Sequence, residues 1–444
     1  MRMTHENAHS AQNIQSPSVS GIAVDVLVCG GGMAGTMAAV AAARGGASVL
    51  LVERWGFLGG SATAGAVGQF VGWETAAGRQ VIQGLAEEVV QRLERQGGSG
   101  GHTHFTMSTG HRMDQVSFDP ERLKLVLDQM ATEAGVRLLF HATLLDVARQ
   151  GDAVSAVTVL TKAGPLEVRP RIAIDASGDL DLLARAGAGF LPLEADEAPQ
   201  PATMMFRFGP IDFSRFEALT SAELQALCRQ GVDSGALARA ALHQSRVPGT
   251  DDGWFNISRV SLDATDPFAL SAGEVEGRRQ AFAAAGFLAA RVPGCEGGRL
   301  VALAAQLGIR ESRRVRGDVV LTADDLRGER RFPDAIAVGA YPMDIHPARG
   351  TGLHFETLGG DRSYEIPFRC LLPAGLGNVL VAGRGISASH GAHASTRVMP
   401  TTMAIGQAAG TAAALACAGN GGPRELDAAL LRDRLRRDAA FLPD

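Results

Sequence analysis

A glycine-rich turn near the N-terminus is the feature that most constrains the fold of this chain. An apolar run at residues 25–29 leads directly into Gly30, Gly32 and Gly35, which have the spacing G-x-G-x-x-G. The first glycine permits a sharp turn, the second lets a pyrophosphate approach the backbone, and the third lets a helix pack closely on a strand. The pattern therefore predicts a strand, a tight turn and a helix that together bind a dinucleotide.

The residues after this turn complete the predicted β-α-β unit. A helix over Met33–Arg44 would direct its positive N-terminal end at the pyrophosphate, which makes Met33 and Ala34 candidate contacts. A second apolar run, residues 48–52, ends at Glu53. An acidic residue in this position accepts hydrogen bonds from a ribose hydroxyl. We therefore expect Glu53 to bind the ribose of the dinucleotide.

The composition narrows the class of protein. The chain has 444 residues, of which 46% are hydrophobic, and its net charge of −5 argues against a nucleic-acid partner. Its five cysteines form no C-x-x-C pair, so a disulfide framework or a zinc ribbon is not expected. The first 20 residues do not resemble a signal peptide, and residues 403–418 suit a core helix better than a membrane span. We expect a cytoplasmic protein with no membrane partner.

The hydrophobic patterns predict an α/β fold, in which an inserted segment interrupts the nucleotide-binding region. We assign residues 1–24 to a disordered tail, residues 25–187 and 365–444 to the nucleotide-binding domain, and residues 188–364 to an α+β substrate or cap domain. Part of residues 66–118 is compatible with either domain. Further elements are predicted as helices over 84–95, 121–134 and 401–418, a loop over 96–112, and strands over 136–140, 143–148, 154–160, 166–168, 171–174, 335–338 and 378–382.

Two further segments distinguish a flavin from a nicotinamide cofactor. Residues 53–65 carry the doublet Gly59-Gly60 and resemble the glycine-doublet segment of the glutathione-reductase-like FAD enzymes. Residues 383–410 resemble the returning FAD segment of the same enzymes. Together with the motifs at 307–314 and 341–346, these segments make the chain similar to the bacterial FAD-dependent oxidoreductase family related to the fumarate reductase flavoproteins.

This resemblance implies a Rossmann-like FAD-binding domain and a set of cofactor contacts. Noncovalent FAD is expected, because the glycine-doublet segment contains neither histidine nor cysteine. Leu144 is counted among the expected FAD contacts because it lies on the strand that follows a predicted helix. At the position of Arg384, many enzymes of this class have an acidic residue instead. Arg384 would neutralise the pyrophosphate, bind an anionic substrate or pair with a nearby carboxylate. The expected FAD contacts are Gly30, Gly32, Met33, Ala34, Gly35, Glu53, Arg54, Gly59, Gly60, Ser61, Leu144, Ala176, Gly178, Gly383, Arg384, Thr401 and Thr402.

Three residues are the candidates for catalysis beside the flavin. His346 is the first choice for a base, because an extended segment would place it on the same face as Asp344. His390 and Arg397 flank the segment that precedes the predicted flavin-facing helix. Arg397 would clamp a carboxylate or stabilise charge on the flavin.

The expected activity is oxidation of a small organic substrate by hydride transfer to flavin N5. Two alternatives stay open: a non-redox flavoprotein of the isomerase or hydratase type, and a nicotinamide-dependent dehydrogenase. The electron acceptor is not identified, and a homo-oligomer is compatible with the sequence. A metal site is not expected, because His102, His104 and His111 lie in a segment without cysteine or acidic residues at ligand spacing.

Overall fold

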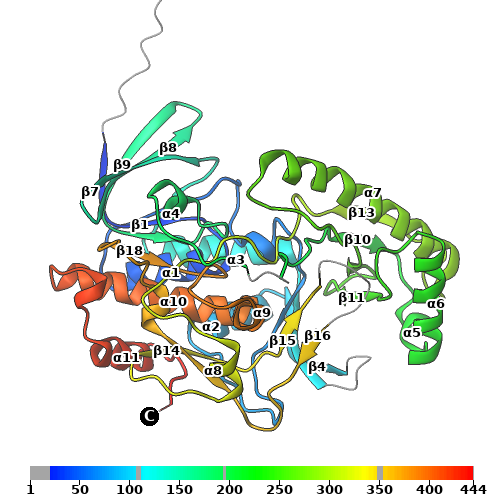
Figure 1. Ribbon diagram of the computed structural model, residues 1–444. Helices are drawn as coiled ribbons and strands as arrows, with labels where there is room; N and C mark the ends of the chain where they lie inside the picture. Colours follow the sequence, from blue (N-terminus) through cyan, green and yellow to red (C-terminus); the bar gives the residue numbers. More distant parts are fainter. Residues whose placement is uncertain (1–20, 107–111, 194–196, 348–353, 444) are drawn as a thin grey trace, which may run out of the picture.

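The computed structural model describes residues 21–106, 112–193, 197–347 and 354–443. A large sheet with packed helices forms one side of the molecule, and a smaller region lies beside it (Figure 1). Of the predicted disordered tail, residues 1–20 lie outside the described residues. The first strand begins at Ile22, earlier than the predicted start at Asp25.

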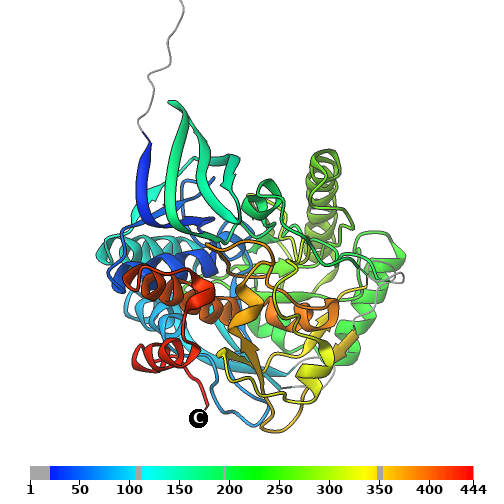
Figure 2. The same ribbon diagram turned by 60° about the vertical axis from the view of Figure 1, so that its left-hand side comes forward.

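The largest sheet contains the predicted β-α-β unit. Its strands are β1 (Ile22–Cys29), β2 (Val49–Val52), β6 (Arg137–Leu139), β7 (Thr143–Gln150), β8 (Ala153–Thr161), β9 (Gly164–Asp175) and β18 (Val379–Val381). Their order is β6-β2-β1-β9-β8-β7, and β18 pairs with the end of β9. Pairing is parallel from β6 through β9 and between β9 and β18, and antiparallel among β7, β8 and β9. The hairpin of β8 and β9 projects beyond the helices in both views (Figures 1 and 2).

Three apolar strands end side by side at one edge of the sheet. Cys29 of β1 pairs with Asp175 of β9, and Asp175 pairs with Val381 of β18. The last residues of these strands are buried, which is typical of parallel strands covered on both faces. The two strands predicted over 166–168 and 171–174 are one continuous strand, β9. The carboxyl ends of β1, β9 and β18 therefore form one edge, where ligands of such sheets bind.

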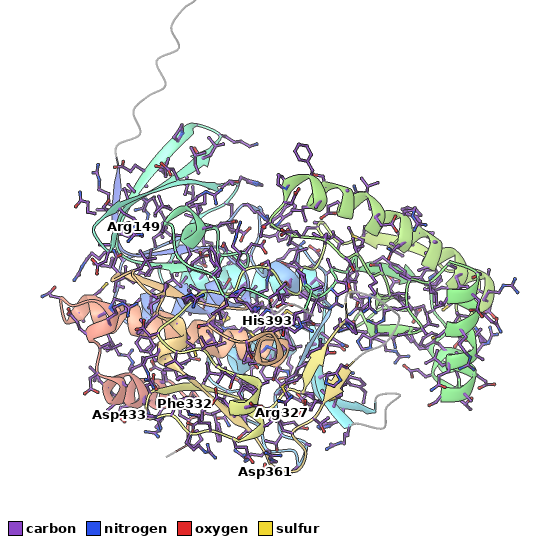
Figure 3. All side chains as sticks on the ribbon, in the orientation of Figure 1. Arg149, Arg327, Phe332, Asp361, His393 and Asp433 are labelled. Carbon is purple, nitrogen blue, oxygen red and sulfur yellow. The ribbon has the colours of Figure 1, made fainter. Side chains whose placement is uncertain are left out.

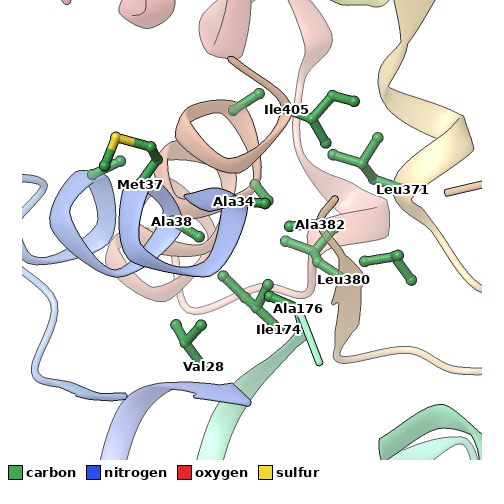
Figure 4. Packing of buried hydrophobic residues seen from close by; sticks show 14 of the residues in the cluster. Val28, Ala34, Met37, Ala38, Ile174, Ala176, Leu371, Leu380, Ala382 and Ile405 are labelled. Atoms are coloured by element: carbon green, nitrogen blue, oxygen red, sulfur yellow. The ribbon is translucent and has the colours of Figure 1, made fainter. Parts of the chain in front are cut away.

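Two small-residue helices pack on this sheet at very close range. They are α1 (Met33–Arg44) and α10 (Met399–Ala418), and Figure 4 shows their contact around Ala34 and Ala38. A Cβ atom at Gly406 would lie 2.1 Å from the Ala34 carbonyl oxygen, and one at Gly410 would lie 2.0 Å from that of Ala38. Only glycine lets the two backbones approach this closely. The contact fixes the start of α1 against the C-terminal part of the chain.

Further helices and short 3-10 turns complete this side of the molecule. Asp119 caps the helix that follows it by accepting a hydrogen bond from the Glu121 N–H. The helices are α2 (Leu85–Arg95), α3 (Pro120–Glu133), α4 (Asp181–Arg185), α8 (Ala323–Arg327), α9 (His390–Thr396) and α11 (Ala428–Arg437), and the turns are η1 (Gly60–Ala62), η2 (Phe368–Leu371) and η3 (Pro423–Glu425).

A second region has its own sheet and its own apolar core. The strands β10 (Phe206–Gly209), β11 (His243–Arg246), β12 (Gly253–Asn256) and β13 (Arg299–Leu303) form a four-stranded sheet in the order β11-β12-β10-β13. Helices α5 (Phe213–Glu217), α6 (Ser221–Asp233) and α7 (Pro267–Arg291) accompany it on the right of Figure 1. Buried side chains between Ala202 and Leu307 form a core separate from that of the large sheet.

Three small antiparallel sheets complete the fold. Their strands are β3 (Gln69–Val71), β4 (Ser99–Thr106) and β5 (Arg112–Phe118), then β14 (Ala335–Gly339) with β17 (Tyr364–Pro367), and β15 (Met343–Ile345) with β16 (His354–Glu356). The prediction of a loop over 96–112 is wrong where the chain forms β4. This polar segment is extended because it pairs with β5, whose Val116 and Phe118 are buried, so tertiary pairing overrides its local preference.

The boundaries predicted for the domains stay a prediction. Val315, Leu321 and Ala335 lie within the predicted insertion, yet their side chains belong to the core of the large sheet. The apolar segment at 403–418 lies within the buried helix α10, in keeping with the predicted core helix. None of the helices in the described ranges has the length and apolar character needed to cross a membrane.

Candidate active site

A cavity of about 670 Å³ opens at the carboxyl edge of β1, β9 and β18. Its wall there is formed by the residues that directly follow each strand, namely Gly30, Ala176 and Ala382 with their successors. The opposite wall comes from the second region, which contributes Thr203, Asn256 and other residues. The cavity thus lies between the predicted nucleotide-binding residues and the predicted substrate domain.

The glycine turn has the close contacts that its spacing predicts. Gly30 has a φ of +101°, and a Cβ atom there would lie 2.5 Å from the Ala176 carbonyl oxygen. A Cβ atom at Gly35 would lie 1.9 Å from the carbonyl oxygen of Gly30. At Gly32, by contrast, the nearest atom to such a Cβ is 4.0 Å away. Gly30 and Gly35 therefore serve backbone packing, whereas Gly32 leaves space at the cavity wall.

Glu53 lies where a ribose-binding acid is expected. It follows β2, lines the cavity and is 7% exposed. Its Oε2 accepts a hydrogen bond from the Gly31 N–H at 2.6 Å, and its Oε1 accepts one from the Trp55 N–H at 2.9 Å. Each carboxylate oxygen keeps further lone pairs for a ligand. The carboxylate is thus held in a fixed orientation beside the glycine turn.

The glycine doublet packs against this turn. Gly59 donates its N–H to the Gly31 carbonyl oxygen at 2.8 Å and has a φ of +109°. A Cβ atom at Gly60 would lie 2.9 Å from the Cα atom of Gly32. Both glycines and Ser61 line the cavity. An extended ligand can therefore run along bare backbone from the first turn to the doublet.

The returning segment closes the same wall from the C-terminal end of the chain. Gly383 has a φ of +97° and lines the cavity together with Arg384. Arg384 forms an ion pair with Asp179, and its Nε is buried without a hydrogen-bond partner among the described residues. Of the open alternatives for Arg384, the structure supports pairing with a nearby carboxylate.

Most of the predicted cofactor contacts converge on the cavity. The cradle of glycines, the fixed carboxylate and the N-terminal amides of α1, which lack partners within the helix, together fit a dinucleotide. The predicted contacts that line the cavity are Gly30, Gly32, Met33, Ala34, Glu53, Arg54, Gly59, Gly60, Ser61, Ala176, Gly178, Gly383, Arg384 and Thr402. Those that do not are Gly35, Leu144 and Thr401.

Leu144 lies away from this wall for a topological reason. It is on β7, which pairs with β8, so β9 and β8 separate it from β1. The strand that follows α3 and adjoins the nucleotide side is instead the short β6, whose Leu139 carbonyl oxygen accepts the Glu53 N–H. Ala142 in turn donates its N–H to the Glu53 carbonyl oxygen. Leu144 as an FAD contact stays a prediction.

His346 and Asp344 form a buried pair in the cavity wall. His346 Nε2 lies 3.2 Å from Asp344 Oδ2, and the two residues flank the end of β15 as the extended geometry predicted. Burial and the charge of Arg310 lower the pKa of His346 to about 3, although Asp344 opposes this shift. Burial raises the pKa of Asp344, but His346 and Arg397 hold it below its ordinary value. At neutral pH, and also in mild acid, the pair is therefore a neutral imidazole beside an ionised carboxylate.

This pairing determines which imidazole nitrogen is free. An ionised carboxylate only accepts hydrogen bonds, so Nε2 of His346 carries the proton that it donates to Asp344. Nδ1 then has the lone pair. Arg397 also lines the cavity, and its Nη2 lies 3.1 Å from the Asp344 carbonyl oxygen. The structure therefore brings His346 and Arg397 together on one carboxylate.

His390 lies outside the cavity wall, unlike the other two catalytic candidates. Its Nδ1 donates to Glu311 Oε1 at 2.9 Å, and Arg314 Nε lies 3.3 Å from the same oxygen. The ring of His390, at the start of α9, thus contacts this buried ion-pair group and does not line the cavity. The neighbouring His393 lies at the centre of the molecule, fully buried, with no hydrogen-bond partner at either ring nitrogen among the described residues (Figure 3).

The structure adds cavity residues that sequence reasoning missed. His243 on β11 lines the cavity, and its Nε2 lies 2.7 Å from Gln69 Nε2. Burial and the charge of Arg239 lower the pKa of His243 to about 4. Arg239 and Arg310 also line the cavity. The motif at 307–314 pointed to the neighbourhood of Arg310, whereas no local pattern marks Arg239 or His243.

The histidines considered for a metal site have other partners. His102 Nε2 lies 3.0 Å from Glu87 Oε2, and His104 pairs with Glu74. His111 lies outside the described residues. No group of three or more side chains suited to a metal ion occurs within the described ranges.

A comparison with protein families gives a match over most of the chain. A family model described as FAD dependent oxidoreductase matches residues 25–435. Similar solved structures include a geranylgeranyl bacteriochlorophyll reductase-like protein from Thermoplasma acidophilum, with 13% identity and a TM-score of 0.49 over 95% of this chain and 84% of that one. Another is p-nitrophenol 4-monooxygenase PnpA from Pseudomonas putida DLL-E4, with 12% identity, a TM-score of 0.48, and coverage of 95% and 86%. No curated protein sequence matches significantly.

Proposed function

Because this chain belongs to the FAD-dependent oxidoreductase family, we propose that it oxidises a small organic molecule and that His346 accepts the substrate proton. The observation that carries this proposal is the buried pair of His346 and Asp344 in the cavity that the glycine turn also lines. A two-electron oxidation needs a group that takes the proton while the cofactor takes the hydride.

The cofactor is FAD, and the residues of the glycine wall would hold it. Gly32 and Gly60 leave bare backbone for the pyrophosphate and its neighbours, and Glu53 would accept the ribose hydroxyls. Bound FAD supplies a hydride acceptor at N5 of its flavin ring. Noncovalent attachment is part of the proposal, since no cysteine or histidine occurs between Glu53 and Gly65.

The charge on Asp344 explains how His346 could act. The carboxylate holds Nε2–H, so Nδ1 would accept the substrate proton, and the imidazolium that results would gain an ion pair with Asp344. The lowered pKa of His346 keeps the ring neutral and ready to accept a proton. A bound negative charge near the guanidiniums would offset their effect and make the ring a stronger base.

The test begins with a screen of small metabolites for those that bleach the FAD-loaded enzyme without oxygen. Lasting bleaching supports oxidation, whereas binding without any bleaching supports the non-redox alternative. With the best substrate, His346→Gln should keep bound FAD but slow flavin reduction about a hundredfold or more. His104→Gln is the matched control, because His104 pairs with Glu74 outside the cavity. A wild-type reduction rate in His346→Gln would contradict the assignment.

A further inference from the structure

We propose that Arg239, Arg310 and Arg397 bind a carboxylate group of the substrate in the cavity. This inference rests on the proposed function, because it names the class of molecule that would meet His346. All three guanidiniums line the same cavity as the imidazole, and they come from separate segments of the chain. None of the three positive charges is fully compensated by its neighbours among the described residues.

Arg310 has hydrogen bonds but no carboxylate partner among the described residues. Its Nη1 donates to the Pro201 carbonyl oxygen and to Thr203 Oγ1, each at 2.6 Å, and its Nη2 donates to Asn256 Oδ1 at 3.2 Å. These acceptors are all neutral. Burial, together with the charges of Arg397 and Arg239, lowers the pKa of Arg310 to about 9. The fold therefore positions this cation firmly without neutralising it.

Arg397 is only partly satisfied by its surroundings. Its Nη2 contacts Asp344 Oδ2 and Gln200 Oε1, both at 3.4 Å, which are long distances for hydrogen bonds. Its Nε is buried and has no hydrogen-bond partner among the described residues. Its Nη2 also donates to the Asp344 carbonyl oxygen at 3.1 Å. Neither N–H of Nη1 has an acceptor among the described residues, so these two donors are available to a ligand.

Arg239 has no hydrogen bond or ion pair with any of the residues that the structure describes. Burial lowers its pKa, and Asp344 partly opposes that shift. A half-buried guanidinium without a partner is costly in a folded protein unless a ligand supplies the missing charge.

The other acids of the cavity wall have partners of their own. Glu53 accepts hydrogen bonds from backbone N–H groups, Asp179 pairs with Arg384, and Glu274 accepts the Leu307 N–H and pairs with Arg278. Asp344 is thus the carboxylate left to face three guanidiniums within the described cavity wall. The two histidines there, His243 and His346, are neutral because their pKa values are lowered. This part of the cavity has an excess of positive charge.

A carboxylate suits this arrangement in shape as well as charge. The planar fork of a guanidinium matches the two oxygens of a carboxylate, and such charge-assisted pairs are among the strongest polar contacts in proteins. With the carboxylate bound, the carbon beside it would lie near the imidazole of His346. The expected substrate is therefore a small organic acid.

The experiment measures anion binding without turnover. Acetate, malonate and succinate are titrated into the FAD-loaded enzyme in a buffer free of carboxylates, with calorimetry and flavin difference spectra as readouts. Malonamide is the uncharged control and inorganic phosphate the alternative oxyanion. We expect at least one of the three carboxylates to bind, and malonamide not to bind. Binding of none of them, equal binding of malonamide, or binding of phosphate alone would overturn the proposal.

The variants separate this site from a general charge effect. Arg239→Gln should weaken carboxylate binding about tenfold or more, and it should fold normally because the Arg239 side chain has no hydrogen-bond or ion-pair partner within the described ranges. Arg310→Gln should have the same effect if it folds. Arg246→Gln is the matched control, because it removes an exposed arginine on β11 that pairs with Glu217. Equal binding by Arg239→Gln and Arg246→Gln would overturn the proposal.

Two results distinguish this inference from the proposed function. If carboxylates bind as expected but no organic acid bleaches the flavin, the oxidation proposal fails and the anion site stands. If Arg397→Gln shifts the reduction potential of the flavin without changing carboxylate affinity, Arg397 serves the cofactor, and its part in the anion site is wrong.

Discussion

Asp344 Oδ2 contacts His346 Nε2 at 3.2 Å and Arg397 Nη2 at 3.4 Å, so one buried carboxylate joins the proposed base to the proposed anion site. Its second oxygen, Oδ1, is buried and has no hydrogen-bond partner among the described residues. Asp344 therefore orients the imidazole and also competes with a bound anion for the guanidinium. Removing the charge of Asp344 should therefore impair proton transfer to His346 but favour anion binding at Arg397.

Asp344→Asn should separate these roles. We expect flavin reduction to slow about a hundredfold, because the imidazolium of His346 loses its ion pair and the ring loses its fixed tautomer. Carboxylate binding should become tighter, since a competing negative charge is gone from the side of Arg397. Stopped-flow reduction and calorimetric titration with acetate measure the two effects, with the exposed Asp361→Asn as control. Weaker acetate binding in Asp344→Asn would indicate a merely structural role.

The contact between α1 and α10 should tolerate no side chain. Gly406→Ala places a Cβ atom 2.1 Å from the Ala34 carbonyl oxygen, and we expect a loss of roughly 1–3 kcal/mol or more in the free energy of unfolding. Gly286→Ala is the matched control, because this helical glycine of α7 has no atom within 4 Å of an added Cβ. It should be neutral or stabilising by about 0.5–1 kcal/mol. Chemical denaturation compares the two, and equal stabilities would contradict the packing argument.

Glu53→Gln should weaken FAD binding. The amide of glutamine can accept only one of the two hydrogen bonds from Gly31 and Trp55, so its NH₂ group would oppose a backbone N–H. We expect the dissociation constant for FAD to rise about tenfold or more, and the stabilisation by added FAD in thermal unfolding to shrink. Glu133→Gln, at an exposed site paired with Arg92, should bind FAD like the wild type.

Acid should destabilise the folded protein below about pH 6.5 through its buried histidines. The pKa of His393 is lowered to about 3 by burial and by the charges of Arg397 and Arg314, although Glu311 opposes the shift. Its folded pKa lies below the unfolded value of about 6.5, so unfolding takes up a proton between these values and stability falls as the pH falls. His346 and His243 act in the same direction, whereas Asp175, with its pKa raised by burial to about 6, acts in the opposite one.

His393→Leu isolates the contribution of one histidine. The ring of His393 has no hydrogen-bond partner among the described residues, so a leucine should fold in its place. Between pH 4 and 6, the slope of the unfolding free energy against pH should fall by the equivalent of about one proton. Denaturant melts at several pH values measure the slope. An unchanged slope would contradict a neutral, buried His393.

The glycine wall was predictable because its chemistry is local in the chain. Gly30, Gly35 and Glu53 lie within one β-α-β unit, and the steric demands of its turn restrict the residue types at each position. Leu144 and His390 were less predictable for different reasons. The order of strands in the sheet determines the neighbours of Leu144, and a buried Glu311, distant in the sequence, determines the direction of the His390 ring.

The nucleotide-binding unit and the pairing of Asp344 with His346 were predictable from the sequence, because each depends on residues within one β-α-β unit or one short extended segment. The flavin class of the cofactor followed from the resemblance of two distant segments to known FAD enzymes. Which charges meet in the cavity is visible only in the tertiary structure. Arg239, Arg310 and Arg397 are separated in the chain, and nothing in their local patterns reveals which partners they have. The burial of a charge and its compensation depend on how the whole molecule packs. The residues on the substrate side of the cavity could therefore be identified only from the tertiary structure.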